Sequence, residues 1–82
     1  MTTREPHFGT GDDLRAALLA KMPFGRFEGE RLMDLPFPYL CWFEREGWPR
    51  GKLGTQMAVV YELQHNDYEM LVELRRLLNQ SP

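Results

Sequence analysis

KMPFGRFEGERLMDLPFPYLCWFEREGWPRGKLG, residues 21–54, contains most of the glycines, prolines and aromatic residues of this chain. Its glycines permit positive φ angles at tight turns, and Pro23 cannot donate a hydrogen bond within a central strand. We therefore expect two short antiparallel strands, Lys21–Phe24 and Arg31–Met33, joined by a turn that contains glycine. A two-stranded hairpin is marginally stable by itself, so its aromatic face must pack against helices.

Helices are expected on both sides of this hairpin. Before it, apolar residues at helical spacing predict a short helix that ends near Ala20. After it, the same spacing predicts helices from Pro36 to Gly47, from Leu53 to Gln64 and from Tyr68 to Leu78. Asp67 is expected to cap the last of these. The predicted fold class is therefore α+β, with one short two-stranded antiparallel hairpin packed against three or four helices.

Length and composition predict one globular domain. A chain of 82 residues is long enough for one domain and no more. Residues 1–9 are mostly polar and have no periodicity, so we expect a flexible N-terminal segment before a single α+β domain at residues 10–82. The apolar and charged fractions lie near the globular average, which argues against disorder.

Several features predict a protein of the bacterial cytoplasm. No apolar run approaches the roughly 20 residues of a membrane helix, and the N-terminal residues lack the apolar stretch of a secretory signal. The single cysteine, Cys41, lies among apolar residues, which is typical of a buried thiol in a reducing compartment. We therefore expect no membrane association.

The sequence does not provide the side-chain sets that catalysis or metal binding requires. His7, His65 and Cys41 lack the paired spacing of zinc ligands. The only serine, Ser81, is not in a nucleophile turn, and no phosphate-binding glycine motif is present. We therefore expect neither a catalytic residue nor a cofactor, and we predict that the protein is not an enzyme.

The segments MPFGRFEG, DLPFPYLCWF and GWPRGKLG resemble a bacterial family of small proteins of unknown function labelled "putative quorum-sensing-regulated virulence factors". The resemblance covers about half of the chain. A shorter part of the pattern, MPFG followed by LP and a tyrosine, resembles an accessory segment that follows the nuclease domain of some 3′–5′ exodeoxyribonucleases. This second resemblance implies a nucleic-acid-binding module that makes contact through the turn. The residues that it carries over are Lys21, Gly25, Arg26, Phe27, Gly29, Arg31, Arg50 and Lys52.

Two functions remain open from the residues. The first is a non-catalytic nucleic-acid-binding module, although the net charge is −2 and Glu28 and Glu30 offset the basic residues of the turn. The second is a protein–protein interaction module that uses the hairpin turn and the Trp48-Pro49 loop, with Phe27 and Trp48 exposed. The residues expected to contact nucleic acid or a protein partner are Lys21, Arg26, Phe27, Arg31, Trp48, Arg50 and Lys52.

Overall fold

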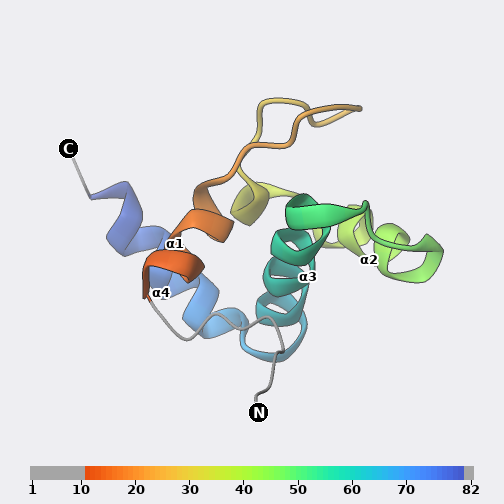
Figure 1. The fold of residues 1–82 in the computed structure, drawn as a ribbon. Helices are drawn as coiled ribbons and strands as arrows, with labels where there is room; N and C mark the ends of the chain where they lie inside the picture. Colours follow the sequence, from red (N-terminus) through yellow and green to blue (C-terminus); the bar gives the residue numbers. More distant parts are fainter. Residues whose placement is uncertain (1–10, 81–82) are drawn as a thin grey trace, which may run out of the picture.

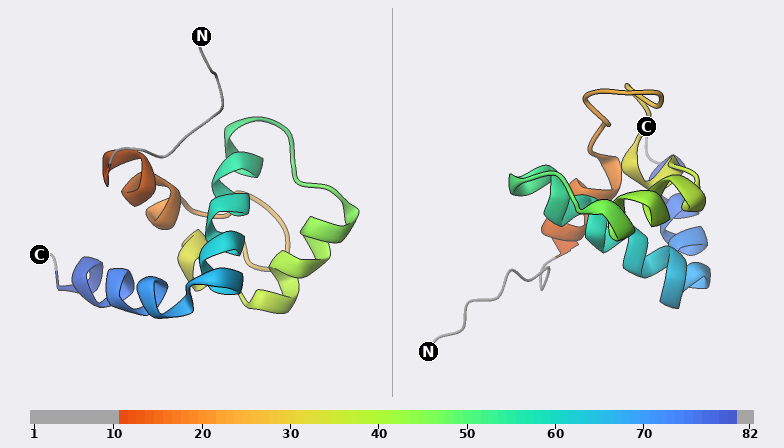
Figure 2. Two further views of the ribbon diagram at one scale, coloured as in Figure 1. Left: turned by 90° about the horizontal axis from the view of Figure 1, so that it is seen from below. Right: turned by 90° about the vertical axis from the view of Figure 1, so that its right-hand side faces the viewer.

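A computed structural model describes residues 11–80, and within this range the regular secondary structure is helical apart from one isolated β-bridge (Figure 1). The elements are α1 (Gly11–Leu19), a 3-10 helix η1 (Leu32–Asp34), α2 (Phe37–Glu46), α3 (Gly51–Asn66) and α4 (Tyr68–Asn79). Helix α3 runs through the middle of the fold, with α1 and α4 on one side and α2 on the other (Figures 1 and 2). The predicted N-terminal segment, residues 1–9, lies outside the described residues.

The predicted α+β class is wrong, because the expected hairpin does not form. The two segments do meet, but only through one isolated antiparallel bridge between Lys21 and Arg31. Pro23 has no N–H to continue a ladder. The second predicted strand is replaced by η1, in which the consecutive residues Leu32 and Met33 are both fully buried. A strand would point neighbouring side chains to opposite faces, whereas a tight helical turn lets both enter the core.

The predicted helices are confirmed, and their ends follow local chemistry. Pro36 stands at the N-cap of α2, and Gly47 ends this helix with a φ of 116°, a value that glycine adopts without strain. Helix α3 begins at Gly51, two residues before the expected Leu53. Asp67 separates α3 from α4, and its carboxylate accepts a hydrogen bond from the backbone N–H of Met70 (3.3 Å), as the sequence predicted.

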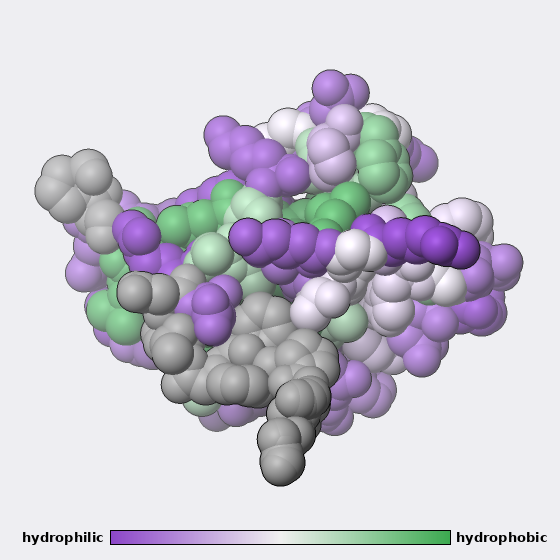
Figure 3. All heavy atoms as spheres, viewed as in Figure 1, coloured by the Kyte–Doolittle hydropathy of each residue, from purple (hydrophilic) through white to green (hydrophobic). Residues whose placement is uncertain are grey.

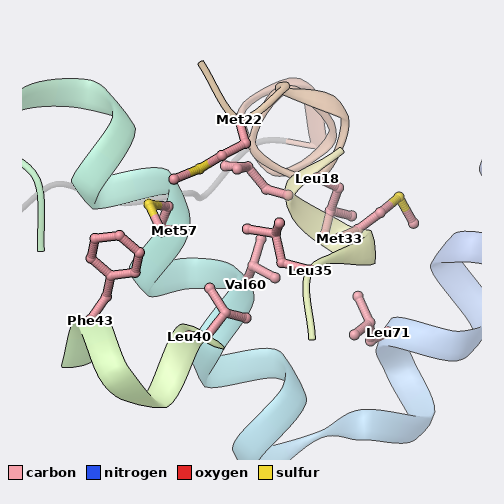
Figure 4. Packing of buried hydrophobic residues seen from close by; sticks show 10 residues of the cluster. Leu18, Met22, Met33, Leu35, Leu40, Phe43, Met57, Val60 and Leu71 are labelled. Carbon is pink, nitrogen blue, oxygen red and sulfur yellow. The ribbon is translucent and has the colours of Figure 1, made fainter. Parts of the chain in front are cut away.

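The core lies where the helices converge on η1 (Figure 4). Helix α1 packs against η1 and α3, while α3 also contacts α2 and α4. Burial of each large apolar side chain contributes about 1.5–3 kcal/mol. The core residues shared among these elements are Leu18, Met22, Leu32, Met33, Leu35, Leu40, Phe43, Met57, Val60 and Leu71.

A close approach of two backbone segments fixes the corner between α2 and α3. A Cβ atom added at Gly54, in the first turns of α3, would lie 1.8 Å from the carbonyl oxygen of Pro49 and 3.3 Å from the Cβ of Trp48. No side chain fits there without movement of the backbone. The connection between the two helices therefore lies directly on α3, and glycine is required at this position.

We predict that Gly54→Ala destabilises the protein, although alanine is the better helix former by about 1 kcal/mol. The clash with Pro49 should lower the free energy of unfolding by about 1–3 kcal/mol, measured by urea denaturation. Thr55→Ala is the matched control at the next, exposed position, and its effect should stay within about 0.5 kcal/mol. If the Gly54→Ala variant were more stable than wild type, the connection between α2 and α3 would be able to move away from the added methyl group at little energetic cost.

Candidate binding surface

The segment from Lys21 to Arg31, here the 21–31 loop, projects from the body of the fold beyond α1 (Figure 1). Backbone hydrogen bonds close its base: the N–H of Met22 donates to the carbonyl of Glu30 (2.9 Å), and the N–H of Gly29 donates to the carbonyl of Met22 (2.8 Å). Met22 is 1% exposed and lies in the core. The base is therefore fixed to the interior, and the tip is presented to solvent.

The tip of the 21–31 loop combines basic and aromatic side chains. Phe24 and Arg26 are exposed at the tip, where Phe24 retains 44% of its accessible surface, and Lys21 is exposed at the base, where it is bridged to Arg31. The guanidinium of Arg26 lies 5.5 Å from the centre of the Phe27 ring, within cation–π range. Hydrophilic and hydrophobic atoms lie beside one another on this loop (Figure 3). The exposed carboxylates of Glu28 and Glu30 offset part of the positive charge.

The expectation that Phe27 and Trp48 are exposed is wrong, since both are half-buried. The Phe27 ring packs edge-on against Tyr39, with 4.7 Å between ring centres, and ties the loop to α2. The Trp48 ring stacks on Phe43 and meets Tyr61 edge-on, at 6.3 Å and 5.7 Å. Rings that the sequence predicted as contacts therefore serve mainly to pack the fold.

The aromatic side chain of α2 that does face solvent is Trp42, which is 49% exposed and touches the Phe43 ring edge-on at 5.0 Å. The sequence pattern did not single out Trp42, because Trp42 and Phe43 are adjacent apolar residues and only their positions around the helix decide which one is exposed. Leu40 and Phe43, three residues apart, are buried, and this places Trp42 on the outer flank. Phe24 was missed for a related reason, since it was assigned to a strand.

The ring cluster continues from Trp48 to the middle of α3. Tyr61 stacks on Phe37 at 5.6 Å and on His65 at 5.6 Å between ring centres. Partial burial among these rings raises the pKa of the Tyr61 hydroxyl, and the charge of Glu44 adds to the effect. The phenol therefore stays neutral, and we assign this cluster to packing between α2 and α3.

Arg31 lies at the base of the loop and is engaged in the fold. Its Nε bonds to the carboxylate of Asp34 at 2.7 Å, and its Nη1 donates to Oδ1 of Asn79 at 3.0 Å. Arg75 of α4 shares the same carboxylate at 3.2 Å and donates to the carbonyl of Met33 at 2.6 Å. These four side chains, Arg31, Asp34, Arg75 and Asn79, form the Asp34 cluster. Arg31 is thus a structural residue that joins η1 to α4.

A second basic group lies at the start of α3. Arg50 and Lys52 are exposed, and the N-cap Arg50 makes no side-chain hydrogen bond to the free N–H groups of the first turn. No acidic residue lies in that turn. The N-terminal end of a helix of 16 residues carries a partial positive charge that adds to the two side chains.

The structure also locates the remaining groups considered for chemistry. Cys41 is a free thiol and is half-buried, so it is more accessible than the sequence suggested. Among residues 11–80, no group of three or more His, Cys, Asp or Glu side chains is arranged to hold a metal ion. None of the helices in this range has the length and apolar character needed to cross a membrane.

Comparison with known proteins identifies relatives. A family model described as "Putative quorum-sensing-regulated virulence factor" matches residues 11–74. The "Uncharacterized protein YpeB" of Escherichia coli strain K12 is 43% identical over 53 residues, which cover 63% of this chain and 74% of that protein. The protein of the same name from Escherichia coli O157:H7 shows the same identity and coverage. No solved structure matches the chain.

We predict that Asp34→Ala destabilises the fold, because it leaves the guanidinium groups of Arg31 and Arg75 together without their shared carboxylate. The loss should be about 1–3 kcal/mol in the free energy of unfolding. Glu46→Ala removes an exposed carboxylate whose contact with Arg45 is 3.8 Å, and its effect should stay within about 0.5 kcal/mol. If Asp34→Ala and Glu46→Ala lowered the free energy of unfolding equally in urea denaturation, the Asp34 cluster would contribute no more to stability than the exposed Glu46 contact.

Proposed function

This chain belongs to the family described as "Putative quorum-sensing-regulated virulence factor", and we propose that it is a nucleic-acid-binding module without catalytic activity. The observation that carries the proposal is the 21–31 loop, whose tip exposes the basic Arg26 and the ring of Phe24 and whose base exposes Lys21. Basic side chains neutralise phosphates, and an exposed ring offers a surface on which a base stacks.

The start of α3 supports the same proposal. Its free backbone N–H groups, together with Arg50 and Lys52, form the type of helix N-terminus that accepts a phosphate oxygen. The two basic groups would then share the ligand, with the loop tip contacting base and backbone and α3 contacting backbone alone. Arg31 is left out of this set because its guanidinium is held by Asp34 and Asn79.

Single-stranded nucleic acid suits this surface better than a duplex. The bases of a duplex are already stacked on one another, whereas those of a single strand are free to stack on Phe24. Glu28 and Glu30, both exposed on the loop, reduce the attraction for phosphate. We therefore propose modest affinity with little sequence preference, and a site of action in the cytoplasm, where bacterial nucleic acid lies.

A catalytic role has less support. The hollow between α1 and α4 is lined, among the described residues, by leucines and by Arg15, without a carboxylate, thiol or imidazole. General acid–base catalysis requires such groups at the reacting atoms. We therefore propose that any chemistry on the nucleic acid is performed by a partner protein and not by this chain.

We predict that the purified protein binds a labelled oligothymidylate with a dissociation constant of about 10⁻⁴–10⁻⁶ M, and more tightly as salt falls toward about 50 mM. Arg26→Ala should weaken binding and lower the slope of log K against log salt by about 0.7, the value for one lost contact to a single strand. Phe24→Ala should cost about 1–3 kcal/mol with the slope unchanged, because stacking carries no net charge.

Arg76→Ala is the matched control for charge, since Arg76 is an exposed arginine of α4 that pairs with Glu73. It should leave both the affinity and the salt slope as in wild type. Binding that is absent at low salt, or that Arg76→Ala weakens as much as Arg26→Ala, would contradict the proposed surface.

A second function, docking to another protein, is favoured by one specific observation: Trp42 is 49% exposed on α2. Tryptophan is enriched among residues that dominate interface energies. The Trp48-Pro49 loop is a weaker candidate than the sequence suggested, since the Trp48 ring is engaged by Phe43 and Tyr61. A partner would therefore anchor on Trp42 and not on Trp48.

If Trp42 anchors a partner, Trp42→Ala should reduce capture of a specific bacterial protein in affinity pull-downs by at least about tenfold, equivalent to about 1.4 kcal/mol. Tyr68→Ala is the control, because Tyr68 is 55% exposed on a different helix. Equal recovery with both variants would remove Trp42 from the function.

A further inference from the structure

A hollow of about 230 Å³ lies between α1 and α4. Helix α1 contributes Leu14 and Leu18 to its wall, and α4 contributes Leu74, Leu77 and Leu78. Among the residues that the structure describes, Arg15 of α1 is the one basic or acidic side chain that lines it. Figure 3 shows hydrophobic atoms at the surface on the left of the view, where α1 meets α4. The hollow uses none of the residues assigned to nucleic-acid contact.

Helix α4 exposes a row of apolar side chains beside this hollow. Leu71 faces the core and is fully buried, whereas Met70 and Leu77 are 46% and 47% exposed. Met70, Leu74 and Leu77 follow one another at spacings of four and three residues, so they share one stripe of the helix. A monomeric surface helix normally turns such a stripe to the interior.

The stripe and the hollow are complementary to each other. Met70 and Leu78 lie at equal distances along α4 on either side of Leu74, with four residues to each. If two α4 helices pack antiparallel about a two-fold axis at Leu74, Met70 of each copy faces Leu78 of the other. Met70 then enters the hollow of the second copy, and the same patch serves both chains, as a two-fold interface requires.

Charge supports the same pairing. Arg15 borders the hollow and makes no ion pair within residues 11–80, and Glu69 is an exposed acid next to Met70 that also makes none there. When Met70 enters the hollow of a second copy, Glu69 is brought toward Arg15 of that copy. Opposite charges at the rim of an apolar contact fix its register.

From the stripe, the hollow and these two charges, we propose that the protein forms a two-fold symmetric homodimer through α1 and α4. The occupant of the hollow is Met70 of a second copy. The 21–31 loop takes no part in this contact, so each dimer presents two loops. The dimer stands whether or not the loop binds nucleic acid, because the two surfaces share no residue.

Analytical ultracentrifugation of the full chain tests the dimer. We expect mostly dimer at about 100 µM protein and mostly monomer at about 1 µM, since dimerisation follows mass action. Met70→Asp should raise the dissociation constant by at least about tenfold, because it places a carboxylate in an apolar contact. Val72→Asp is the matched control, since Val72 is 43% exposed on the other flank of the same helix, and it should dimerise as wild type does.

Charge reversal separates a direct contact from a general loss of structure. Arg15→Glu and Glu69→Arg should each weaken the dimer, and the double variant should recover most of the wild-type affinity because the attraction is restored with exchanged signs. Circular dichroism checks that each variant is folded. Three outcomes would overturn the proposal: a wild-type protein that is monomeric at about 500 µM, a Met70→Asp variant that dimerises as wild type does, or a double variant that recovers no affinity. If the wild-type protein is monomeric, the hollow would instead accept a helix of another protein.

Discussion

The fold depends on the burial of neighbouring side chains in the single turn η1. Leu32 and Met33 are fully buried, and Leu35 is 2% exposed just after the turn. Helices α1 and α3 both pack against this turn. The polar atoms of this turn face α4, where the carboxylate of Asp34 and the carbonyl of Met33 accept hydrogen bonds from Arg75. One turn of 3-10 helix thus supplies the apolar contact for two helices and the polar contact for a third.

The need to bury this turn explains which parts of the fold could be predicted from the sequence. The helix ends were predictable because Pro36, Gly47 and Asp67 act through their own backbone or side chain. The class was not, because Leu32 and Met33 are compatible with a strand until the rest of the core demands that both point inward. Tertiary burial, absent from any local pattern, turned the second expected strand into a helical turn.

The sequence positions of the proposed binding surface could be selected in advance, but the exposure of each side chain could not. Basic residues at Lys21, Arg26, Arg50 and Lys52 are exposed, while Arg31 is drawn into the fold by Asp34. The spacing of Arg31 and Asp34 by three residues was a signal that a local ion pair would form. The exposure of the aromatic residues was harder to predict, because a chain this small buries most of its rings. Only the position of each ring around its helix shows which ones remain exposed.

Met22 shapes the 21–31 loop from within. This side chain is 1% exposed and is packed in the core, while its backbone N–H and carbonyl both close the loop above it. The base of the loop therefore takes its orientation from the interior packing of α1, η1 and α3, while Phe27 ties the loop to Tyr39 of α2. A substitution that repacks the interior around this methionine therefore also shifts Phe24 and Arg26, so the stability of the core is linked to the surface that the loop exposes.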